Sequence, residues 1–238
     1  MVLIAKFTSA VILAAGNGTR FGGKVKKQYV EILGTPAINR TIAAFEECEL
    51  IDEIILVGDK EALSEVIEGF DFKKIAMIVD GGETRQESAL LGFDSVSEKS
   101  KFVAIHDAAR CLVTPEIIEA TVKEAYKYRA AAAAHKSEDT VKIADKNGII
   151  EETTDRDKIW LVQTPQVFMN DVYRSAAYMA KKDEATVTDD CMLCERLGFE
   201  VKLVECGREN IKLTGPDDLM LCEAILAYRE KAKEDVKK

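Results

Sequence analysis

The sequence lacks several features on which whole classes of protein depend. No stretch approaches the roughly 20 consecutive apolar residues of a membrane span, and no signal peptide is apparent in the opening residues, MVLIAKF. Positive charge is in deficit, because 33 Lys and Arg residues stand against 42 Asp and Glu residues, and the net charge is −9. Such acidity argues against general binding to nucleic acid or to anionic membranes. We therefore expect a cytoplasmic protein that binds neither.

Histidine is scarcer still, with two residues among 238. Neither lies near the one C-x-x-C motif, Cys191 to Cys194, and no second C-x-x-C could complete a zinc site. That motif follows Thr188-Asp189-Asp190, which is typical of a helix start, so we interpret its thiols as two positions on a helix. Without a secretory context, the six cysteines are expected to be reduced.

A stretch near the start, Ser9–Gln28, is by contrast rich in glycine and basic residues. It opens as an apolar run that predicts a buried strand to about Ala15, and it continues as a loop. The loop places four glycines among four basic residues: Gly16, Gly18, Gly22 and Gly23 with Arg20, Lys24, Lys26 and Lys27. Glycine has no Cβ, so backbone N–H groups can approach an anion closely, while the cations supply opposite charge. The stretch therefore predicts a polyphosphate site.

Through residue 134 the chain alternates apolar runs with amphipathic segments. The expected strands are 10–15, 53–57, 75–79, 102–105 and 130–134, and the expected helices begin at Pro36, Glu61, Glu83 and Pro115. The runs are apolar rather than alternating, as in parallel strands covered by helices on both sides. We predict an α/β fold of the Rossmann-like kind, a mostly parallel sheet with helices on both faces, as a single domain over residues 1–238.

Residues 136–157 interrupt this pattern with the polar sequence KSEDTVKIADKNGIIEETTDRD. Val141–Ile143 and Ile149–Glu151 predict the two strands of a hairpin, with Asn147-Gly148 as its turn. A hairpin with so little core is unstable alone, so we expect it to pack on a second subunit or to form a mobile flap. Core-like sequence returns at Trp160–Phe168, and further helices are expected at 170–182, at 188–197 and after Pro216.

Unusual residues follow the predicted strands at the end where open parallel sheets bind ligands. The glycine loop follows the first strand, Asp80-Gly81-Gly82 follows the third, and His106-Asp107-Ala108-Ala109-Arg110 follows the fourth. Three such segments on one edge predict a shared pocket. We interpret His106 as a structural residue at the strand end rather than as a base.

The spacing within the glycine loop separates three kinds of phosphate-binding motif. Against the P-loop pattern G-x-x-x-x-G-K-[ST], Gly18 to Lys24 fits, but Val25 replaces the required hydroxyl. Against the dinucleotide pattern G-x-G-x-x-G, the third glycine comes one residue late. The pattern A-A-G-x-G-x-R, with a lysine seven residues further on, is fitted without a gap by Ala14 to Arg20 and Lys27. That pattern is typical of nucleotidyltransferases.

Seven blocks carry a resemblance over nearly the whole chain, from about Ser9 to Leu226: AVILAAGNGTRFGGKVKKQY, DGGETRQES, HDAAR, EDTVK, DRDKIWLVQTPQVF, VTDD and NIKLTGPDDL. In order and spacing they resemble the 2-C-methyl-D-erythritol 4-phosphate cytidylyltransferase family of the non-mevalonate isoprenoid pathway. The ribitol-5-phosphate cytidylyltransferases share most of these blocks, but D-R-x-x-x-W before T-P-Q favours the first family. A non-catalytic nucleotide-binding regulatory protein is the alternative of another class, and a nicotinamide-dependent oxidoreductase is a weaker one.

The resemblance implies a nucleotidyltransferase fold whose hairpin is a dimerisation arm, and a homodimer in which each arm completes the partner's site. It implies transfer of CMP from CTP to 2-C-methyl-D-erythritol 4-phosphate, a polyol phosphate, giving 4-diphosphocytidyl-2-C-methyl-D-erythritol and pyrophosphate. Mg²⁺ is expected with CTP, held mainly by the CTP phosphates. Asp107 is the one candidate protein ligand for this ion.

Family residues carry over position by position. Those that match the groups acting at the reacting phosphate are Arg20, Lys27, Arg156 and Lys212. Those that match the nucleotide pocket are Ala14, Ala15, Gly16, Gly18, Gly81, Gly82, Glu83, Arg85 and Ser88. Those that match acceptor-binding positions are Asp107, Ala108, Arg110, Thr140, Thr164 and Thr188. The chain departs from the family at Cys111, where proline usually follows the arginine, and at Gly215, where most relatives carry a larger residue.

Overall fold

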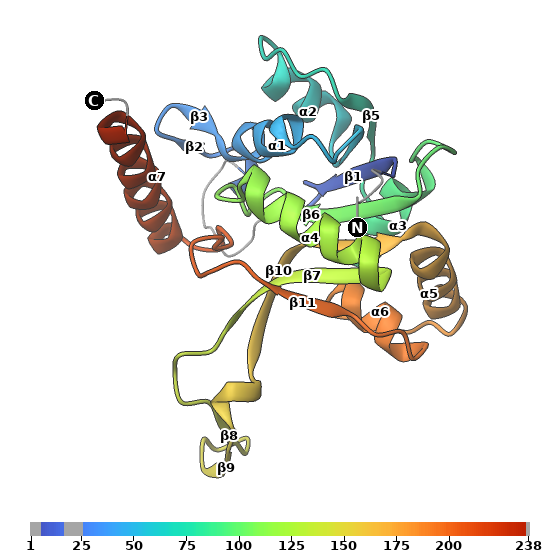
Figure 1. The fold of residues 1–238 in the computed structure, drawn as a ribbon, viewed down its shortest axis with the longest axis vertical. Helices are drawn as coiled ribbons and strands as arrows, with labels where there is room; N and C mark the ends of the chain where they lie inside the picture. The colour runs from blue at the N-terminus through green and yellow to red at the C-terminus, as the bar shows by residue number, and fades with distance from the viewer. Residues whose placement is uncertain (1–5, 17–25, 237–238) are drawn as a thin grey trace.

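Seven strands form the central sheet in the part of the chain that the structure, a computed structural model, describes: residues 6–16 and 26–236 (Figure 1). In spatial order they are β11 (Lys202–Glu205), β7 (Ala130–Lys136), β10 (Trp160–Met169), β6 (Phe102–Asp107), β1 (Thr8–Leu13), β4 (Glu53–Val57) and β5 (Ile75–Val79). β10 runs antiparallel to β6 and β7, and the other neighbours pair in parallel. The predicted mostly parallel sheet is confirmed.

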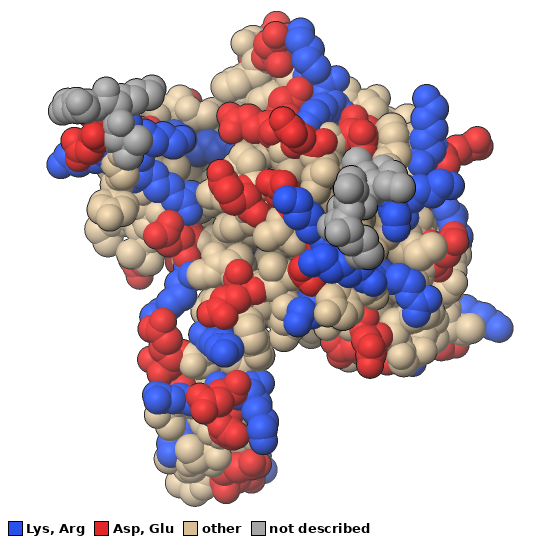
Figure 2. Space-filling model, viewed as in Figure 1, with Lys and Arg blue, Asp and Glu red and all other residues tan. Residues whose placement is uncertain are grey.

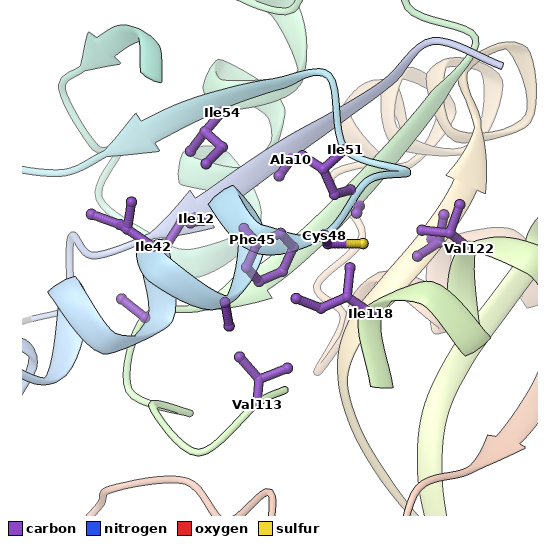
Figure 3. Close-up of a cluster of buried hydrophobic side chains, with 14 of the residues drawn as sticks. Ala10, Ile12, Ile42, Phe45, Cys48, Ile51, Ile54, Val113, Ile118 and Val122 are labelled. Atoms are coloured by element: carbon purple, nitrogen blue, oxygen red, sulfur yellow. The ribbon is translucent and has the colours of Figure 1, made fainter. Parts of the chain in front are cut away.

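Alternate residues of β1 face opposite sides of the sheet, and each side is covered by helices (Figure 1). Ala10 and Ile12 pack on the side of α1 (Ala37–Glu47), α2 (Lys60–Ile67) and α4 (Pro115–Tyr128), in the buried cluster of Figure 3. Val11 and Leu13 pack on the side of α3 (Arg85–Asp94), α5 (Asn170–Lys182) and α6 (Asp190–Arg196). Burial on both sides explains the unbroken apolar run, and helices on both faces are confirmed.

Several predicted helix starts are shifted by one or two residues, among them those of α3 and α1. α3 begins at Arg85 rather than Glu83, because the Thr84 hydroxyl accepts a hydrogen bond from the Glu87 amide (3.1 Å) and the Glu87 carboxylate accepts one from the Thr84 amide (3.3 Å). α1 begins at Ala37 rather than Pro36. Pro36 keeps an extended backbone and pairs with Glu31 across the short strands β2 (Glu31–Ile32) and β3 (Thr35–Pro36).

The predicted hairpin is present as an arm that extends away from the body (Figure 1). It consists of β8 (Lys142–Ala144), β9 (Ile150–Thr153) and the short 3-10 helix η3 (Arg156–Lys158). The predicted turn at Asn147-Gly148 is present, and it also includes Lys146. The Gly148 amide donates to the Asp145 carbonyl oxygen (3.0 Å), so Lys146 and Asn147 are the central residues of the turn. The Asp145 carboxylate stabilises it by accepting from the Asn147 amide (2.9 Å), and Gly148 supplies the left-handed conformation with φ +82°.

The remaining described elements are the 3-10 helix η2 (Lys27–Tyr29) and the C-terminal helix α7 (Pro216–Val236). Cys191 and Cys194 lie on α6, as the helix interpretation predicted. Within residues 6–16 and 26–236, no group of three or more His, Cys, Asp or Glu side chains could hold a metal ion, and no helix is long and apolar enough to cross a membrane. Figure 2 shows basic and acidic side chains interspersed over one face of the molecule, the arm included.

Candidate active site

A cavity of about 330 Å³ opens at the carboxyl ends of β1 and β6, the sheet edge where the sequence predicts a pocket. The predicted site residues that line it are Ala14, Ala15, Gly16, Lys27, Gly82, Glu83, Arg85, Ser88, Asp107 and Lys212. The structure thus brings residues of the predicted nucleotide pocket together with two of the predicted phosphate-binding lysines. Two further predictions, Gly18 and Arg20, lie outside the described residues.

The two ends of the glycine loop are fastened by Gln28, which sequence reasoning did not select. Its side chain is buried, and Nε2 donates to the carbonyl oxygens of Ala14 (2.6 Å) and Gly16 (3.1 Å). These bonds hold the exit of β1 against η2, the element that carries Lys27. The only signal in the sequence was an uncharged amide within KKQY. Its burial depends on the distant end of β1, so no local pattern could have identified the contact.

Thr84, Leu13 and Ala109 also line the cavity without having been predicted. Thr84 carried a readable signal, because a threonine three residues before a glutamate is the signature of a capping box. Leu13 and Ala109 have no chemistry that would single them out.

Close backbone approach shapes the loop after β5. A Cβ added to Gly81 would lie 2.2 Å from the Cβ of Ala15, so any side chain there would displace Ala15. The Gly82 amide donates to Ser88 Oγ (3.0 Å), and the Ser88 hydroxyl donates to the Thr84 carbonyl oxygen (2.9 Å). Ser88 therefore holds the wall of the predicted cytosine pocket with its hydroxyl hydrogen already engaged.

Asp107 is the centre of a charge network at the cavity. Its Oδ1 accepts a hydrogen bond from Arg85 Nε (2.9 Å), and its Oδ2 accepts one from Lys212 Nζ (2.5 Å). Burial alone would raise the pKa of this carboxyl. The charges of Arg85 and Lys212 outweigh burial and hold the pKa well below its ordinary value. The carboxylate is therefore ionised at neutral pH and fixes Lys212 at the cavity wall.

Arg85 continues this network toward the core. Its Nη1 donates to Asp190 Oδ2 (2.7 Å), and Asp190, which is 1% exposed, also accepts from the Tyr173 hydroxyl (2.9 Å). Burial would lower the pKa of the guanidinium, but Asp190 and Asp107 raise it above its ordinary value. Arg85 thus braces the start of α3 against the end of β6 and the start of α6.

Magnesium would find few ligands on the chain itself. Both carboxylate oxygens of Asp107 are engaged by cations, and Glu83 is the one other carboxylate in the described lining. This donor set does not form a protein cage for Mg²⁺. The residues present fit an ion held mainly by the phosphates of a nucleotide, and the expectation of Mg²⁺ remains a prediction.

The other predicted acceptor residues of the body are not part of the described lining of the cavity. Ala108 is buried, and its amide donates to the Leu13 carbonyl oxygen (3.0 Å). Arg110 Nη1 donates to the Asn210 carbonyl oxygen (2.8 Å), and Thr164 is 4% exposed. Thr188 is exposed just before α6.

The two predicted arm residues, Thr140 and Arg156, lie apart from the cavity of their own chain. Both are exposed on the arm, and Arg156 Nη1 donates to the Glu138 carbonyl oxygen (3.4 Å). The arm extends away from the body (Figure 1), so these two side chains belong to a site only if a second chain supplies its cavity.

Residues 8–228 match one protein family, described as IspD: 2-C-methyl-D-erythritol 4-phosphate cytidylyltransferase. Among curated proteins, the chain is 45% identical over 222 residues to the 2-C-methyl-D-erythritol 4-phosphate cytidylyltransferase of Caldanaerobacter subterraneus subsp. tengcongensis, covering 92% of this chain and 98% of the relative. It is 40% identical over 230 residues to the protein of the same name from Alkaliphilus oremlandii, covering 95% of this chain and 98% of the relative.

Solved structures agree with the fold. The crystal structure of 4-diphosphocytidyl-2C-methyl-D-erythritol synthase from Anaerococcus prevotii superposes with a TM-score of 0.83 at 32% identity, over 94% of this chain and 97% of that one. The 2-C-methyl-D-erythritol 4-phosphate cytidylyltransferase of Thermus thermophilus gives a TM-score of 0.74 at 28% identity, over 92% and 98%. The predicted nucleotidyltransferase fold is confirmed. Because the family match spans most of its length, the chain belongs to the 2-C-methyl-D-erythritol 4-phosphate cytidylyltransferase family.

Proposed function

We propose that this chain transfers CMP from CTP to 2-C-methyl-D-erythritol 4-phosphate, giving 4-diphosphocytidyl-2-C-methyl-D-erythritol and pyrophosphate. The observation that carries the proposal is the cavity, where the start of the glycine loop, Lys27 and Lys212 meet at one sheet edge. Membership of the family supports the same reaction. The ribitol phosphate and regulatory alternatives are not favoured, because the matched family and the relatives described above carry the methylerythritol name.

The reaction needs no general base. A phosphate monoester has its second pKa near ~6, so the acceptor oxygen is already an anion at neutral pH. This oxygen forms a bond to the α-phosphorus of CTP. The bond from the α-phosphorus to the bridging oxygen breaks, and pyrophosphate leaves with the electron pair. His106 takes no proton here, because it is fully buried and burial lowers its pKa to about 3.

The chain's own task is to bring two polyanions together and to stabilise negative charge at the α-phosphate. Lys27 presents a compact charge beside the glycine loop, and Lys212 presents another from a distant segment of the chain. Asp107 orients Lys212 at the cavity wall by accepting a hydrogen bond from its Nζ. Arg20 is expected to grip two phosphate oxygens with its planar fork.

Pyrophosphate release from CTP, with methylerythritol phosphate and ribitol 5-phosphate as paired acceptors, tests the proposal. We expect turnover with methylerythritol phosphate and none above the CTP-only control with ribitol 5-phosphate. Turnover with ribitol 5-phosphate alone would show that ribitol 5-phosphate, and not methylerythritol phosphate, is the acceptor. CTP binding without turnover of either acceptor would support the regulatory alternative.

We also propose that two chains form a homodimer through the arm, so that Thr140 and Arg156 reach the partner's cavity. Apolar side chains exposed on the arm support this: Ile143 is 45% exposed, Ile149 66% and Ile150 60%. Leu161 and Val162 are exposed where the arm joins β10. An apolar cluster of this kind on a protruding segment is typical of a contact surface. The cytoplasmic location of the dimer remains a prediction.

Complementation within a heterodimer tests the shared site. In a dimer of one Lys27→Ala chain and one Arg156→Ala chain, exchange of arms leaves one cavity with both side chains. We therefore expect about half of the wild-type activity per dimer. If each chain completes its own cavity, both cavities of this heterodimer are defective, and its activity stays at the level of the two mutant homodimers. The heterodimer is isolated by a different affinity tag on each chain.

A further inference from the structure

A closed ring of hydrogen bonds joins four residues beside the Asp107 wall of the cavity. His106 Nε2 contacts the Arg110 carbonyl oxygen (3.3 Å), and Arg110 Nη1 donates to the Asn210 carbonyl oxygen (2.8 Å). Asn210 Nδ2 donates to the Thr164 carbonyl oxygen (2.8 Å), and Thr164 Oγ1 contacts His106 Nδ1 (3.0 Å). The ring therefore ties together the end of β6, the loop after it, β10 and the segment before α7.

The partners determine which atom donates in each bond. The Arg110 carbonyl oxygen can only accept, so Nε2 of His106 carries the hydrogen. The imidazole is fully buried, and neither ring nitrogen contacts a carboxylate that would stabilise a positive charge, so the ring is neutral and Nδ1 has a lone pair that accepts from the Thr164 hydroxyl. The same Thr164 oxygen accepts from the Asp107 amide (3.1 Å). The Thr164 hydroxyl therefore donates its single hydrogen to His106 and cannot donate to a substrate.

The ring also holds β10 where that strand is irregular. The pairing of β10 with β7 shifts between Val162 and Gln166, and Thr164 lies within this shift. Asn210 Nδ2 donates to Gln163 Oε1 (2.9 Å) as well as to the Thr164 carbonyl oxygen, so one buried amide fixes two consecutive residues of the irregular segment. Asn210 also precedes Lys212 by two residues, and Lys212 is the cation bound to Asp107.

We propose that His106 and Asn210 are positioning residues for the acceptor side of the site. His106 positions Asp107 through the Thr164 hydroxyl, which bonds to both residues. It positions Arg110 through the bond from Nε2 to the Arg110 carbonyl oxygen. Asn210 positions the Arg110 side chain, because its carbonyl oxygen accepts from Arg110 Nη1. It also anchors the segment that carries Lys212. Thr164 then acts on the acceptor through Asp107 rather than as a hydrogen-bond donor to it. This role rests on the proposed function, whereas the state of the imidazole does not.

The imidazole tautomer is measured directly by ¹⁵N NMR on the wild-type protein at neutral pH. The chain has two histidines, so comparison with a His135→Asn variant assigns the spectrum. We expect His106 to show a protonated Nε2 and an unprotonated Nδ1. A protonated Nδ1, alone or together with Nε2, would overturn the proposed donors and acceptors in the ring of hydrogen bonds. This result is independent of whether the chain turns over any acceptor.

Steady-state kinetics of two His106 variants tests the positioning role. His106→Asn can keep a partner for Thr164 but cannot reach the Arg110 carbonyl oxygen, and His106→Gln does the reverse. Since either change removes one buried hydrogen bond, we expect each to raise the KM for the acceptor phosphate about tenfold and to leave the KM for CTP within about twofold. Asn210→Ala, which keeps the carbonyl group that receives Arg110, is expected to act in the same direction.

His135→Gln is the matched control. His135 Nδ1 contacts Gln163 Nε2 (3.0 Å) outside the ring, so its replacement should leave both KM values within about twofold of wild type. Melting temperatures are measured for all variants. If the His106 variants melt at lower temperature but keep the wild-type KM for the acceptor, the residue is structural alone and the positioning role is wrong.

Discussion

Lys27→Ala is expected to lower kcat by about 10²–10³-fold, or roughly 2.7–4 kcal/mol of transition-state stabilisation, with little change in the KM for CTP. Lys27 lines the cavity on η2, and Gln28 at the next position donates hydrogen bonds to the carbonyl oxygens of Ala14 and Gly16 at the start of the glycine loop. A cation fixed in this way is most effective where charge develops at the α-phosphate. Steady-state pyrophosphate release gives both constants, and calorimetric titration with CTP gives the dissociation constant.

Lys26→Ala is the matched control for this variant. Lys26 Nζ lies 3.9 Å from the carboxylate of Asp59, and both side chains are more than a third exposed. A surface pair of this kind contributes roughly 0–1 kcal/mol to stability. Lys26 is not part of the described lining of the cavity, so its replacement should leave kcat within about twofold. A Lys27→Ala enzyme with unchanged kcat and a raised KM for CTP would show that Lys27 binds the ground state and the transition state equally.

Arg85→Leu is expected to lower the free energy of unfolding by roughly 3–5 kcal/mol, because it leaves two nearly buried carboxylates without their shared cation. Arg85 donates to Asp107 at 2.9 Å and to Asp190 at 2.7 Å, and the side chains of these acids are 11% and 1% exposed. Urea denaturation measures the change. Arg196→Leu is the control, since its bond to Asp183 lies on the surface and should contribute no more than about 1 kcal/mol.

The stability difference between wild type and Arg85→Leu should shrink as the pH falls below about 4. Burial raises the pKa of Asp107, but Arg85 and Lys212 lower it further than burial raises it, so the folded-state pKa lies below the unfolded value. The ionised carboxylate therefore contributes stability that is fully present above the unfolded pKa and is lost as the pH falls through the folded pKa. Without Arg85, less of this stability exists to be lost. A difference that is equal at about pH 7 and about pH 3 would contradict this account.

The layout of the fold could be predicted because a strand that is buried on both faces has a run of consecutive apolar residues in its sequence. β1 and β4 contain the unbroken apolar runs Ala10–Leu13 and Ile54–Val57, and these residues are buried, as the runs predicted. The direction of β10 could not be predicted. Its sequence, WLVQTPQVFM, is compatible with either direction, and only its pairing with β6 and β7 makes it antiparallel. The start of α1 was misplaced because Pro36 suits both a first helical turn and the extended residue before it.

The candidate site could be predicted where one short segment supplies both the glycines that let the backbone approach an anion and the basic side chains that bind it. Gly16 and Lys27 belong to such a segment and do line the cavity. The bond from Arg85 to Asp190 joins residues far apart in the sequence, and no local spacing indicates it. Thr140 and Arg156 are a different case. Their roles were predicted from the family resemblance, and within one chain they lie away from the cavity. The heterodimer experiment therefore tests whether they act in the partner's cavity.

β10 lies between β6 and β7 in the sheet, yet it is synthesised after both. On the ribosome, β5, β4, β1 and β6 can pair with one another as they emerge, whereas β7 has no neighbour in the sheet until β10 arrives and β11 follows. The order of strands in space thus imposes an order of assembly. Until Trp160–Met169 has been made, one edge of β6 has unpaired backbone groups, and this edge is where the nascent chain needs protection from pairing with other chains.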